Sequence, residues 1–348
     1  MRRLLTGFVF SIAVLTGAPR HADAQVYPER IRTVVRNRVE AYQRRDENRE
    51  EQVERYTKTV RIGAAGELDV SNIAGDIVVT KGSGNDATIE VVKTARGRSA
   101  EDARALLQLV QVEISERNGR AEVKTQYPQG DEMRRNNRRN MNVSVAYTIT
   151  APAGTRLTVK SISGSVKVTD IKGEVAAESV SGDVRIGGSG RVGTAKSVSG
   201  NVEVSDAQID GTLSAGSISG DVILRRITAR RVDTSSISGE VKIEDAKCER
   251  VDAQSISGTV SFGGPLARSG RYSLKSHSGE VRVAVAGGSG FEVEASSFSG
   301  EVRSDLPITT HGSTSDRGHR RTLSGTYGDG SAVLELTTFS GSIVITKR

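Results

Sequence analysis

The chain has 348 residues, of which 38 are Gly, 6 are Pro and none is Trp. Aromatic residues make up 4% and apolar residues 36%, which is too little for the thick core of a large globular domain but enough for a thin core repeated along an axis. The single cysteine, Cys248, excludes an internal disulfide framework and a zinc site built from cysteines. The formal net charge of +7 is mildly basic, which favours anionic partners.

The first 24 residues carry the three parts of a secretory signal. Arg2 and Arg3 precede an apolar run over residues 4–18, and Ala22-Asp23-Ala24 is a small-residue cleavage site. The run is shorter than the ~20 residues of a membrane-spanning helix, so we predict cleavage of residues 1–24 and no transmembrane segment afterwards. The protein is then secreted, to the periplasm or the outer cell surface of a bacterium, where we expect no nucleic-acid partner.

A highly charged segment follows the signal. Ile31, Val35, Val39 and Tyr42 recur at three- and four-residue steps, which predicts a helix with a narrow apolar stripe. We assign residues 25–57 to a charged helical spacer, which either stays solvated or docks on a partner or on the next domain.

From Val60 onward the apolar residues recur with a period of two, which predicts strands. Further strands are expected around residues 112–114, 121–123 and 143–149. Ser99 is a helix N-cap, so a helix is expected over residues 100–109. Residues 58–160 are therefore predicted to be an N-terminal strand-rich part with one helix. Its role would be to cap the following repeats, because an uncovered terminal coil exposes a strand edge.

From residue 161 the chain repeats a Ser-x-Ser-Gly tetrad, the strongest signal in the sequence. Apolar residues stand two and four positions after each glycine, and a further apolar position follows in most repeats. Each repeat thus holds at least two short strands and must stack on its neighbours at about 4.8 Å. Residues 161–348 are predicted to form a mainly β, single-stranded parallel β-solenoid (β-helix) of about nine to ten coils. Successive tetrad glycines are 18, 18, 20, 19, 19, 21, 21 and 41 residues apart, and the last gap fits two coils or one coil with an insertion.

These residues resemble a known family, the bacterial putative-adhesin domain of unknown function, a β-solenoid built from Ser-x-Ser-Gly-(Asp/Glu)-Val-x-Val coils. The resemblance covers about residues 58–348 and implies the solenoid fold, but it brings no catalytic residues. It also includes the segments Gly66-Glu67-Leu68-Asp69-Val70, Ile73-Ala74-Gly75-Asp76-Ile77, Thr150-Ala151-Pro152-Ala153-Gly154, Gly325-Thr326-Tyr327-Gly328-Asp329-Gly330 and Leu334-Glu335-Leu336.

Alternation along the strand predicts where the tetrad side chains point. The Ile or Val between the two serines is expected to face the core, with His277 as a tolerated replacement in the same column. Both serines would then face outward as hydroxyl ladders. They would serve either a tight corner that bonds neighbouring backbone or a surface for glycans or lateral packing. The outer ladder is Ser181, Ser199, Ser219, Ser238 and Ser257.

Two charged columns run beside the tetrads. An acidic residue often follows the glycine, and a basic residue often stands two positions further on, which predicts a solvated lattice of ion pairs. Calcium binding or polysaccharide cleavage by the acidic column is the alternative. The columns are Asp183, Asp221, Glu240, Glu280 and Glu301, beside Lys167, Arg185, Lys242, Arg282 and Arg303.

The sequence lacks the usual catalytic signatures. His311 and His319 flank Ser313 in a polar segment, but no Gly-x-Ser-x-Gly elbow, phosphate loop or metal-spaced histidine pair occurs. We therefore expect no catalytic, cofactor-binding or metal-binding residues, and no cofactor.

Four arginines in one polar segment are the sequence's best candidate for an electrostatic contact. They are either a solvated loop or a site that binds lipopolysaccharide or acidic envelope glycans, because paired guanidinium groups hold phosphate and carboxylate. The four are Arg134, Arg135, Arg138 and Arg139.

Together these patterns favour a non-enzymatic, secreted envelope protein that acts as an adhesin-like binding or scaffolding solenoid. One alternative is a self-assembling structural solenoid, joined through an open last coil at Ile343 and Ile345. Others are a sensor head for a membrane protein partner and an enzyme acting on glycans through the acidic column.

Overall fold

The computed structural model describes residues 49–128, 142–310 and 321–348, and Glu50–Arg348 form one compact unit. The predicted signal, most of the spacer, the four arginines at 134–139, and His311 and His319 lie outside the described residues. Their predicted roles therefore stay predictions.

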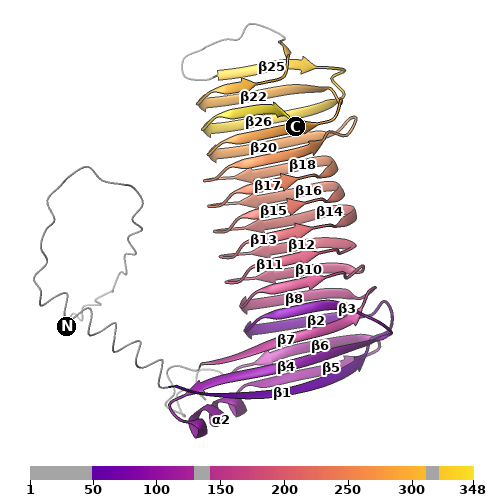
Figure 1. Cartoon of the computed structure of the whole chain (residues 1–348), viewed down its shortest axis with the longest axis vertical. Coiled ribbons are helices and arrows are strands. Elements are labelled where there is room, and N and C mark those ends of the chain that lie inside the picture. The colour runs from indigo at the N-terminus through magenta and orange to yellow at the C-terminus, as the bar shows by residue number, and fades with distance from the viewer. Residues whose placement is uncertain (1–48, 129–141, 311–320) are drawn as a thin grey trace, which may run out of the picture. The chain divides into compact units, whose positions relative to one another are not determined.

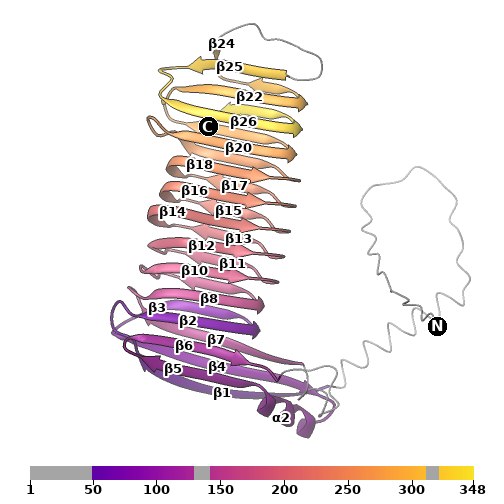
Figure 2. The ribbon, with the colours of Figure 1, turned by 180° about the vertical axis from the view of Figure 1, so that it is seen from behind.

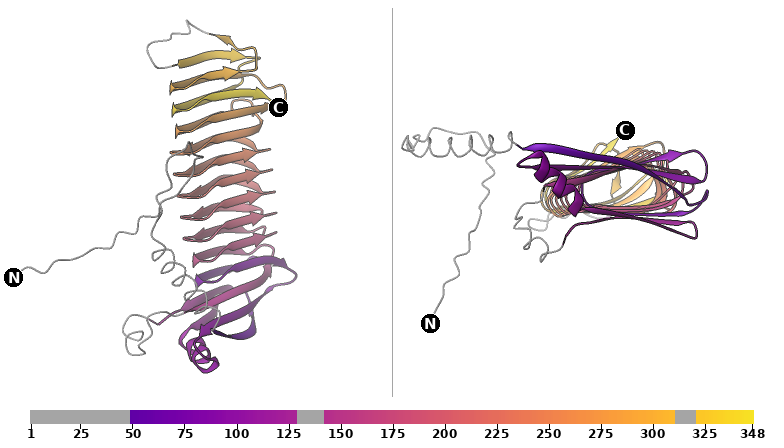
Figure 3. Two further views of the ribbon diagram at one scale, coloured as in Figure 1. Left: turned by 60° about the vertical axis from the view of Figure 1, so that its left-hand side comes forward. Right: turned by 90° about the horizontal axis from the view of Figure 1, so that it is seen from below.

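The described residues are mainly β, arranged as two long sheets that lie face to face (Figures 1 and 3). Sheet A has thirteen strands in the order β1-β4-β7-β3-β9-β11-β13-β15-β17-β19-β21-β27-β23. Sheet B has fourteen, in the order β24-β25-β22-β26-β20-β18-β16-β14-β12-β10-β8-β2-β6-β5.

The N-terminal part contains seven strands and the one helix of the described residues. These are β1 (Glu50–Arg61), β2 (Glu67–Ala74), β3 (Ile77–Gly82), β4 (Asp86–Gly97), α2 (Ala100–Leu109), β5 (Gln111–Arg117), β6 (Arg120–Gln126) and β7 (Val143–Pro152).

The central repeats alternate a longer strand in sheet B with a shorter strand in sheet A. In chain order these are β8 (Arg156–Ser163), β9 (Val166–Thr169), β10 (Glu174–Ser179), β11 (Val184–Gly187), β12 (Arg191–Ser197), β13 (Val202–Ser205), β14 (Gln208–Ser217), β15 (Val222–Arg225), β16 (Thr228–Ser236), β17 (Val241–Glu244), β18 (Lys247–Ser255), β19 (Val260–Pro265), β20 (Arg271–Ser278) and β21 (Val281–Ala286).

The C-terminal part adds six strands. These are β22 (Phe291–Ser299), β23 (Val302–Ser304), β24 (Thr309–Thr310), β25 (Arg321–Tyr327), β26 (Ala332–Ser340) and β27 (Ile343–Lys347).

The central strands pair in parallel with equivalent residues side by side. In sheet A, for example, Val184 stands between Val166 and Val202. Each repeat therefore turns once and gives one strand to each sheet, so the cross-section has two sides. The period of two after each tetrad, predicted from the sequence, is confirmed by this register.

The core is a thin layer between the two sheets, filled chiefly by Val, Ile, Leu and Ala. The apolar positions two and four residues after each glycine are buried in the central repeats, as Val222 and Leu224 illustrate at 0% exposure. The largest fully buried side chains are Tyr147, Tyr272, Phe262 and Phe291. A core this thin is filled mostly by aliphatic side chains and therefore needs few aromatic residues.

The helix α2 agrees with the sequence prediction in both its bounds and its cap. The Ser99 hydroxyl accepts a hydrogen bond from the Asp102 backbone N–H at 3.1 Å, which satisfies one of the unpaired donors of the first turn. Ala103, Leu106 and Leu107 are buried. The helix lies at the β1–β4 end of the described unit (Figure 1).

The predicted boundary at residue 57 is wrong. Residues 50–57 were expected to be the last part of the helical spacer. They form the first part of β1, which pairs antiparallel with β4 over its whole length. The strand is highly charged because it is the outermost strand of sheet A, and charged side chains protect such an edge from pairing with other chains.

The stack also extends into the part of the chain before residue 161. The pair β2–β3 lies between β6–β7 and β8–β9, joined in parallel to all four. The repeats therefore continue from the central coils into the N-terminal part without a break at residue 160, although the tetrad is not recognisable there apart from Asn72-Ile73-Ala74-Gly75.

The last coil in the chain is not the last coil of the stack. Strand β26 lies between β20 and β22, and β27 lies between β21 and β23, an arrangement visible from behind in Figure 2. The gap of 41 residues thus holds one coil with an insertion, which includes β24 and β25. The expected open joint at Ile343 and Ile345 is wrong, because both side chains are 0% exposed in the interior of the stack.

The first serine of each tetrad faces the core, and the expectation that both serines point outward is wrong. Ser217 Oγ donates to the Gly200 carbonyl of the preceding coil at 2.8 Å and accepts from the Gly220 N–H of its own coil at 3.0 Å. The same donor bond is made by Ser197, Ser236, Ser255, Ser276, Ser297 and Thr338. The Ile or Val that follows is consequently turned outward.

The tetrad glycine is required by how closely the turns stack. A Cβ added to Gly220 would overlap the carbonyl oxygen of Gly200, and the same clash recurs at Gly182, Gly200, Gly239, Gly258 and Gly279. The glycine gives the space and the serine links the backbone groups on either side of it.

Replacing Ser217 with Ala should lower the free energy of unfolding by about 1–3 kcal/mol, because it leaves a buried carbonyl and a buried N–H without this partner. Denaturant unfolding followed by circular dichroism measures the effect. The matched control is Ser219→Ala at the exposed serine of the same tetrad, which should change stability by less than about 0.5 kcal/mol. Equal losses in the two variants would contradict the linking role.

Replacing Ile345 with Lys should destabilise the protein by about 3 kcal/mol or more, because it buries an unpaired charge between β21 and β23. The control is Val344→Glu on the same strand, whose side chain is half-buried and stands between Arg282 and Arg303. Thermal unfolding should separate the two variants clearly. An unchanged melting temperature for Ile345→Lys would contradict the interior position of β27.

Candidate ligand-binding face

A row of half-exposed apolar side chains runs along the outer surface of sheet B. Its members are the middle residues of successive tetrads, and their exposed fractions lie between 38% and 51%. We name this set the apolar row. It consists of Ile162, Val180, Val198, Ile218, Ile237, Ile256, Phe339 and Phe298, in the order in which the coils stack.

The apolar row follows directly from the inward serine. Side chains alternate along a strand, so a buried Ser197 places Val198 outside. The ladder continues through this position, because the Ser219 N–H donates to the Val198 carbonyl at 2.9 Å. The expectation that these residues face the core, drawn from alternation with outward-facing serines, is wrong. The hydrogen bonds that hold the serine inward turn the following Ile or Val outward.

At its C-terminal end the row becomes aromatic. The rings of His277 and Phe339 lie 5.0 Å apart and those of Phe339 and Phe298 lie 4.8 Å apart, nearly parallel in both pairs. His277, expected near the core, therefore occupies the outer row between Ile256 and Phe339. Because Phe339 is covered by a ring on each side, it presents its edge rather than its face to solvent.

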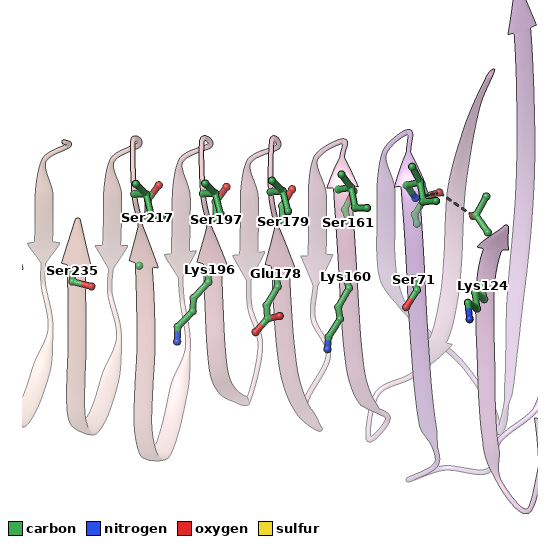
Figure 4. A pocket seen from close by; sticks show the side chains of 18 residues that line it. Ser71, Lys124, Lys160, Ser161, Glu178, Ser179, Lys196, Ser197, Ser217 and Ser235 are labelled. Atoms are coloured by element: carbon green, nitrogen blue, oxygen red, sulfur yellow. Dashed lines mark hydrogen bonds between the residues drawn. The ribbon is translucent and has the colours of Figure 1, made fainter. Parts of the chain in front are cut away.

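A second row lies beside the apolar row on sheet B, two residues earlier in each strand. Strand register makes its members neighbours in the order Lys124, Ser71, Lys160, Glu178, Lys196, Gly216 and Ser235. We name it the lysine row. In Figure 4 the labelled side chains of the lysine row line one side of the hollow.

The two rows border a shallow trough of about 740 Å³. It extends from β6 across β2, β8, β10, β12 and β14 to β16, and its volume lies within the range of small-molecule sites. A second hollow of about 500 Å³ lies further along the same face, beside Ile256, Lys275, His277, Phe298 and Phe339.

Three lysines and one glutamate line the trough. Lys124, Lys160 and Lys196 are exposed and make no hydrogen bond or ion pair with other residues that the structure describes. Glu178 stands between Lys160 and Lys196 in the row and is likewise unpaired within the described residues. The ammonium groups at the N-terminal end of the trough can therefore turn toward a ligand, with the carboxylates of Glu113 and Glu178 as strand neighbours of Lys124 and Lys160.

A buried polar network supports this end of the trough from below. Asn72 takes the place of the inward serine, and its amide donates to the carbonyls of Val145 at 2.7 Å and Gly75 at 2.9 Å. Thr125 bonds both Asn72 and the Tyr147 hydroxyl. Burial raises the pKa of Tyr147 to about 12, so this network stays uncharged and rigid rather than reactive.

Several charged side chains on sheet A form ion pairs with one another. Arg185 contacts Asp183 and Arg282 contacts Glu280, each at 2.6 Å, and Arg303 contacts Glu301. Further along the same strands, Arg225 bridges Glu203 at 2.9 Å and Glu244 at 3.0 Å. Hydrogen bonds from Lys242 and Arg225 lower the pKa of Glu244. The predicted pairing of adjacent acidic and basic residues is thus seen in several coils.

The carboxylates of the acidic column take part in the turns and ion pairs of the coils. Asp221 accepts the Glu240 backbone N–H at 2.8 Å and so serves the turn. No group of three or more His, Cys, Asp or Glu side chains with metal-binding geometry occurs in the described part of the chain. Cys248 is 3% exposed, and burial raises the pKa of its thiol to about 11, which keeps it in the unreactive thiol form at neutral pH.

The predicted hydroxyl ladder is exposed on the outside of the coils. Its serines lie next to the apolar row at the bend between the two sheets and do not line the trough. The trough lysines were missed in the sequence because the residue at this position varies from strand to strand and because Lys124, Lys160 and Lys196 are far apart in the chain. The sequence did contain a clue to this row: Lys160, Glu178 and Lys196 each directly precede a tetrad, so the repeat places them side by side in neighbouring coils.

None of the helices in the described residues is long and apolar enough to cross a membrane. No curated protein matches the chain.

Several solved structures are similar to the chain at low identity. A protein of Parabacteroides distasonis named a putative lipid binding protein is 14% identical, with 85% of this chain and 97% of that chain covered and a TM-score of 0.44. A putative adhesin of Bacteroides fragilis is 14% identical at the same coverage with a TM-score of 0.41. A putative adhesin of Parabacteroides distasonis is 12% identical, again at 85% and 97%, with a TM-score of 0.39.

The family model described as Toastrack DUF4097 matches residues 59–226 and 238–346. The match spans most of the chain, both the N-terminal strands and the repeats, and agrees with the resemblance to an adhesin-like domain of unknown function. The chain therefore belongs to the Toastrack DUF4097 family.

Proposed function

We propose that this protein is a non-enzymatic, adhesin-like binding solenoid of the bacterial envelope, secreted to the periplasm or the outer surface. The predicted signal over residues 1–24 supports the compartment, and the family supports a binding role. In this proposal the ten strand pairs from β2–β3 to β26–β27 form ten coils, at the upper end of the predicted nine to ten, and the remaining N-terminal strands with α2 cap them.

One observation carries the proposal: the unpaired lysines beside the apolar row of sheet B. On sheet A, Arg225, Arg185 and Arg282 have carboxylate partners. The three trough lysines form no ion pair with the described residues and stand beside exposed apolar side chains. Apolar contact gives affinity and the cations select anionic ligands. We infer that the ligand lies along the outer face of sheet B.

The combined variant Lys124→Ala, Lys160→Ala and Lys196→Ala should weaken binding to an anionic envelope polymer about tenfold or more and make it less sensitive to salt, because the attractive charges are removed. The assay measures binding of the purified secreted chain to lipopolysaccharide, peptidoglycan and acidic glycans at low and high salt, with products checked for cleavage. The control variant replaces Lys81, Lys167 and Lys347 on sheet A and removes the same net charge.

Equal weakening in both variants would contradict a role for sheet B. Cleavage products would contradict the non-enzymatic proposal. A size that grows with concentration, and that is lost when Ile237 and Ile256 are replaced by Asp, would favour the self-assembling alternative, which the length of the exposed apolar row supports.

The arginine segment remains a separate candidate for the same contact. A variant with Arg134, Arg135, Arg138 and Arg139 replaced by Ala, run in the same assay, tests the predicted contact with lipopolysaccharide or acidic glycans.

A further inference from the structure

We propose that the trough on sheet B binds one molecule of a long-chain anionic lipid, with its acyl chain along the apolar row and its phosphate beside Ser71. This inference rests on the proposed function and specifies the ligand class of that binding face.

The anion site is defined by strand register. Ser71 in β2 is the direct neighbour of Lys124 in β6 and of Lys160 in β8. With strands about 4.8 Å apart, both ammonium groups reach an anion placed over the Ser71 hydroxyl. Neither forms an ion pair with the described residues, although their other strand neighbours are Glu113 and Glu178. Two cations and one hydroxyl around one point are suited to a phosphate group.

The acyl chain has a track of matching length. From β2 the trough continues over β8, β10 and β12 to β14, four strand spacings or about 19 Å, which is the length of a palmitoyl chain. Ile162, Val180, Val198 and Ile218 border this track with exposed aliphatic side chains.

Two residues of the lysine row set the orientation. Glu178 stands on the far side of Lys160 from Ser71, so an anion is repelled from the middle of the trough. Gly216, in β14, has no side chain and leaves the far end open for the end of the acyl chain. The phosphate therefore lies at β2 and the chain end at β14.

A sugar polymer fits the same face less well. Carbohydrate rings pack against exposed aromatic faces, but the trough is bordered by aliphatic residues, and further along the row Phe339 is covered on both faces by His277 and Phe298. Apolar edges and branched aliphatic side chains favour a hydrocarbon chain.

The test is equilibrium dialysis of the secreted chain against radiolabelled 1-palmitoyl lysophosphatidate below its micelle concentration. We expect one molecule bound per chain. Affinity should fall about tenfold or more in Lys124→Ala/Lys160→Ala, since each lysine near an anionic headgroup contributes about a factor of five. The control Lys81→Ala/Lys167→Ala on sheet A should bind as the parent does.

Two further ligands test chain and headgroup separately. Palmitoyl lysophosphatidylcholine, which has the same chain and no net charge, and glycerol phosphate, which has no chain, should both bind about tenfold or more weaker. Palmitate, which carries a carboxylate, distinguishes a phosphate from a general anion site. Binding of palmitate as tight as that of lysophosphatidate would overturn the phosphate assignment.

The variant Gly216→Leu tests the orientation without changing charge. It should weaken palmitoyl lysophosphatidate but leave a decanoyl analogue unaffected, because the shorter chain ends before β14. A thermal midpoint equal to that of the parent shows that the variant is folded. Equal effects on both chain lengths would overturn the orientation.

The outcomes separate this inference from the proposed function. If lysophosphatidate does not bind while an envelope polymer does so through the trough lysines, the lipid inference fails and the binding face stands. If the lysine variants alter no interaction, both fail. If only vesicles or a second copy of the chain occupy the apolar row, the single-lipid inference is overturned.

Discussion

The close stacking of the turns between sheet B and sheet A is the constraint on which the rest of the structure depends. At each tetrad the backbone of one coil approaches that of the next so closely that a Cβ on the glycine would overlap the glycine carbonyl beneath it. The inward serine links that carbonyl to the next N–H, as Ser217 does between Gly200 and Gly220. Since every coil must stack in the same way, the same tetrad recurs, and all other positions are set in register by it.

The constraint also divides the surface into two different faces. It holds the outward residues of sheet A in straight columns, where arginines such as Arg225 reach carboxylates in neighbouring coils. On sheet B the same register lines up aliphatic side chains beside lysines that have no partner in the described residues. Because the stack fixes both rows in register, a ligand of the proposed kind would bind there without the entropy cost of ordering loops.

Much of this fold could be predicted from the sequence, because the repeat and its period of two determine which residues pair. The helix at residues 100–109 and its Ser99 cap were likewise predictable from local signals. The side-chain direction at the tetrad was not predictable from the sequence. By polarity alone Ser197 would face solvent and Val198 would face the core, but the hydrogen bonds of Ser197 reverse this arrangement. The trough was hidden for a related reason: Lys124 lies in β6, outside the tetrad region, and joins Lys160 only through β2.

The position of β26–β27 inside the stack bears on how the protein is built. A chain made from its N-terminus delivers β20–β21 and β22–β23 first, yet these two coils become neighbours of a coil that is completed some forty residues later. Folding coil by coil along the chain, the simple route for a repeat protein, therefore stops short of the C-terminal end. Contacts of high sequence separation are slow to form, and the C-terminal third of the stack can close only after β26 and β27 have been synthesised.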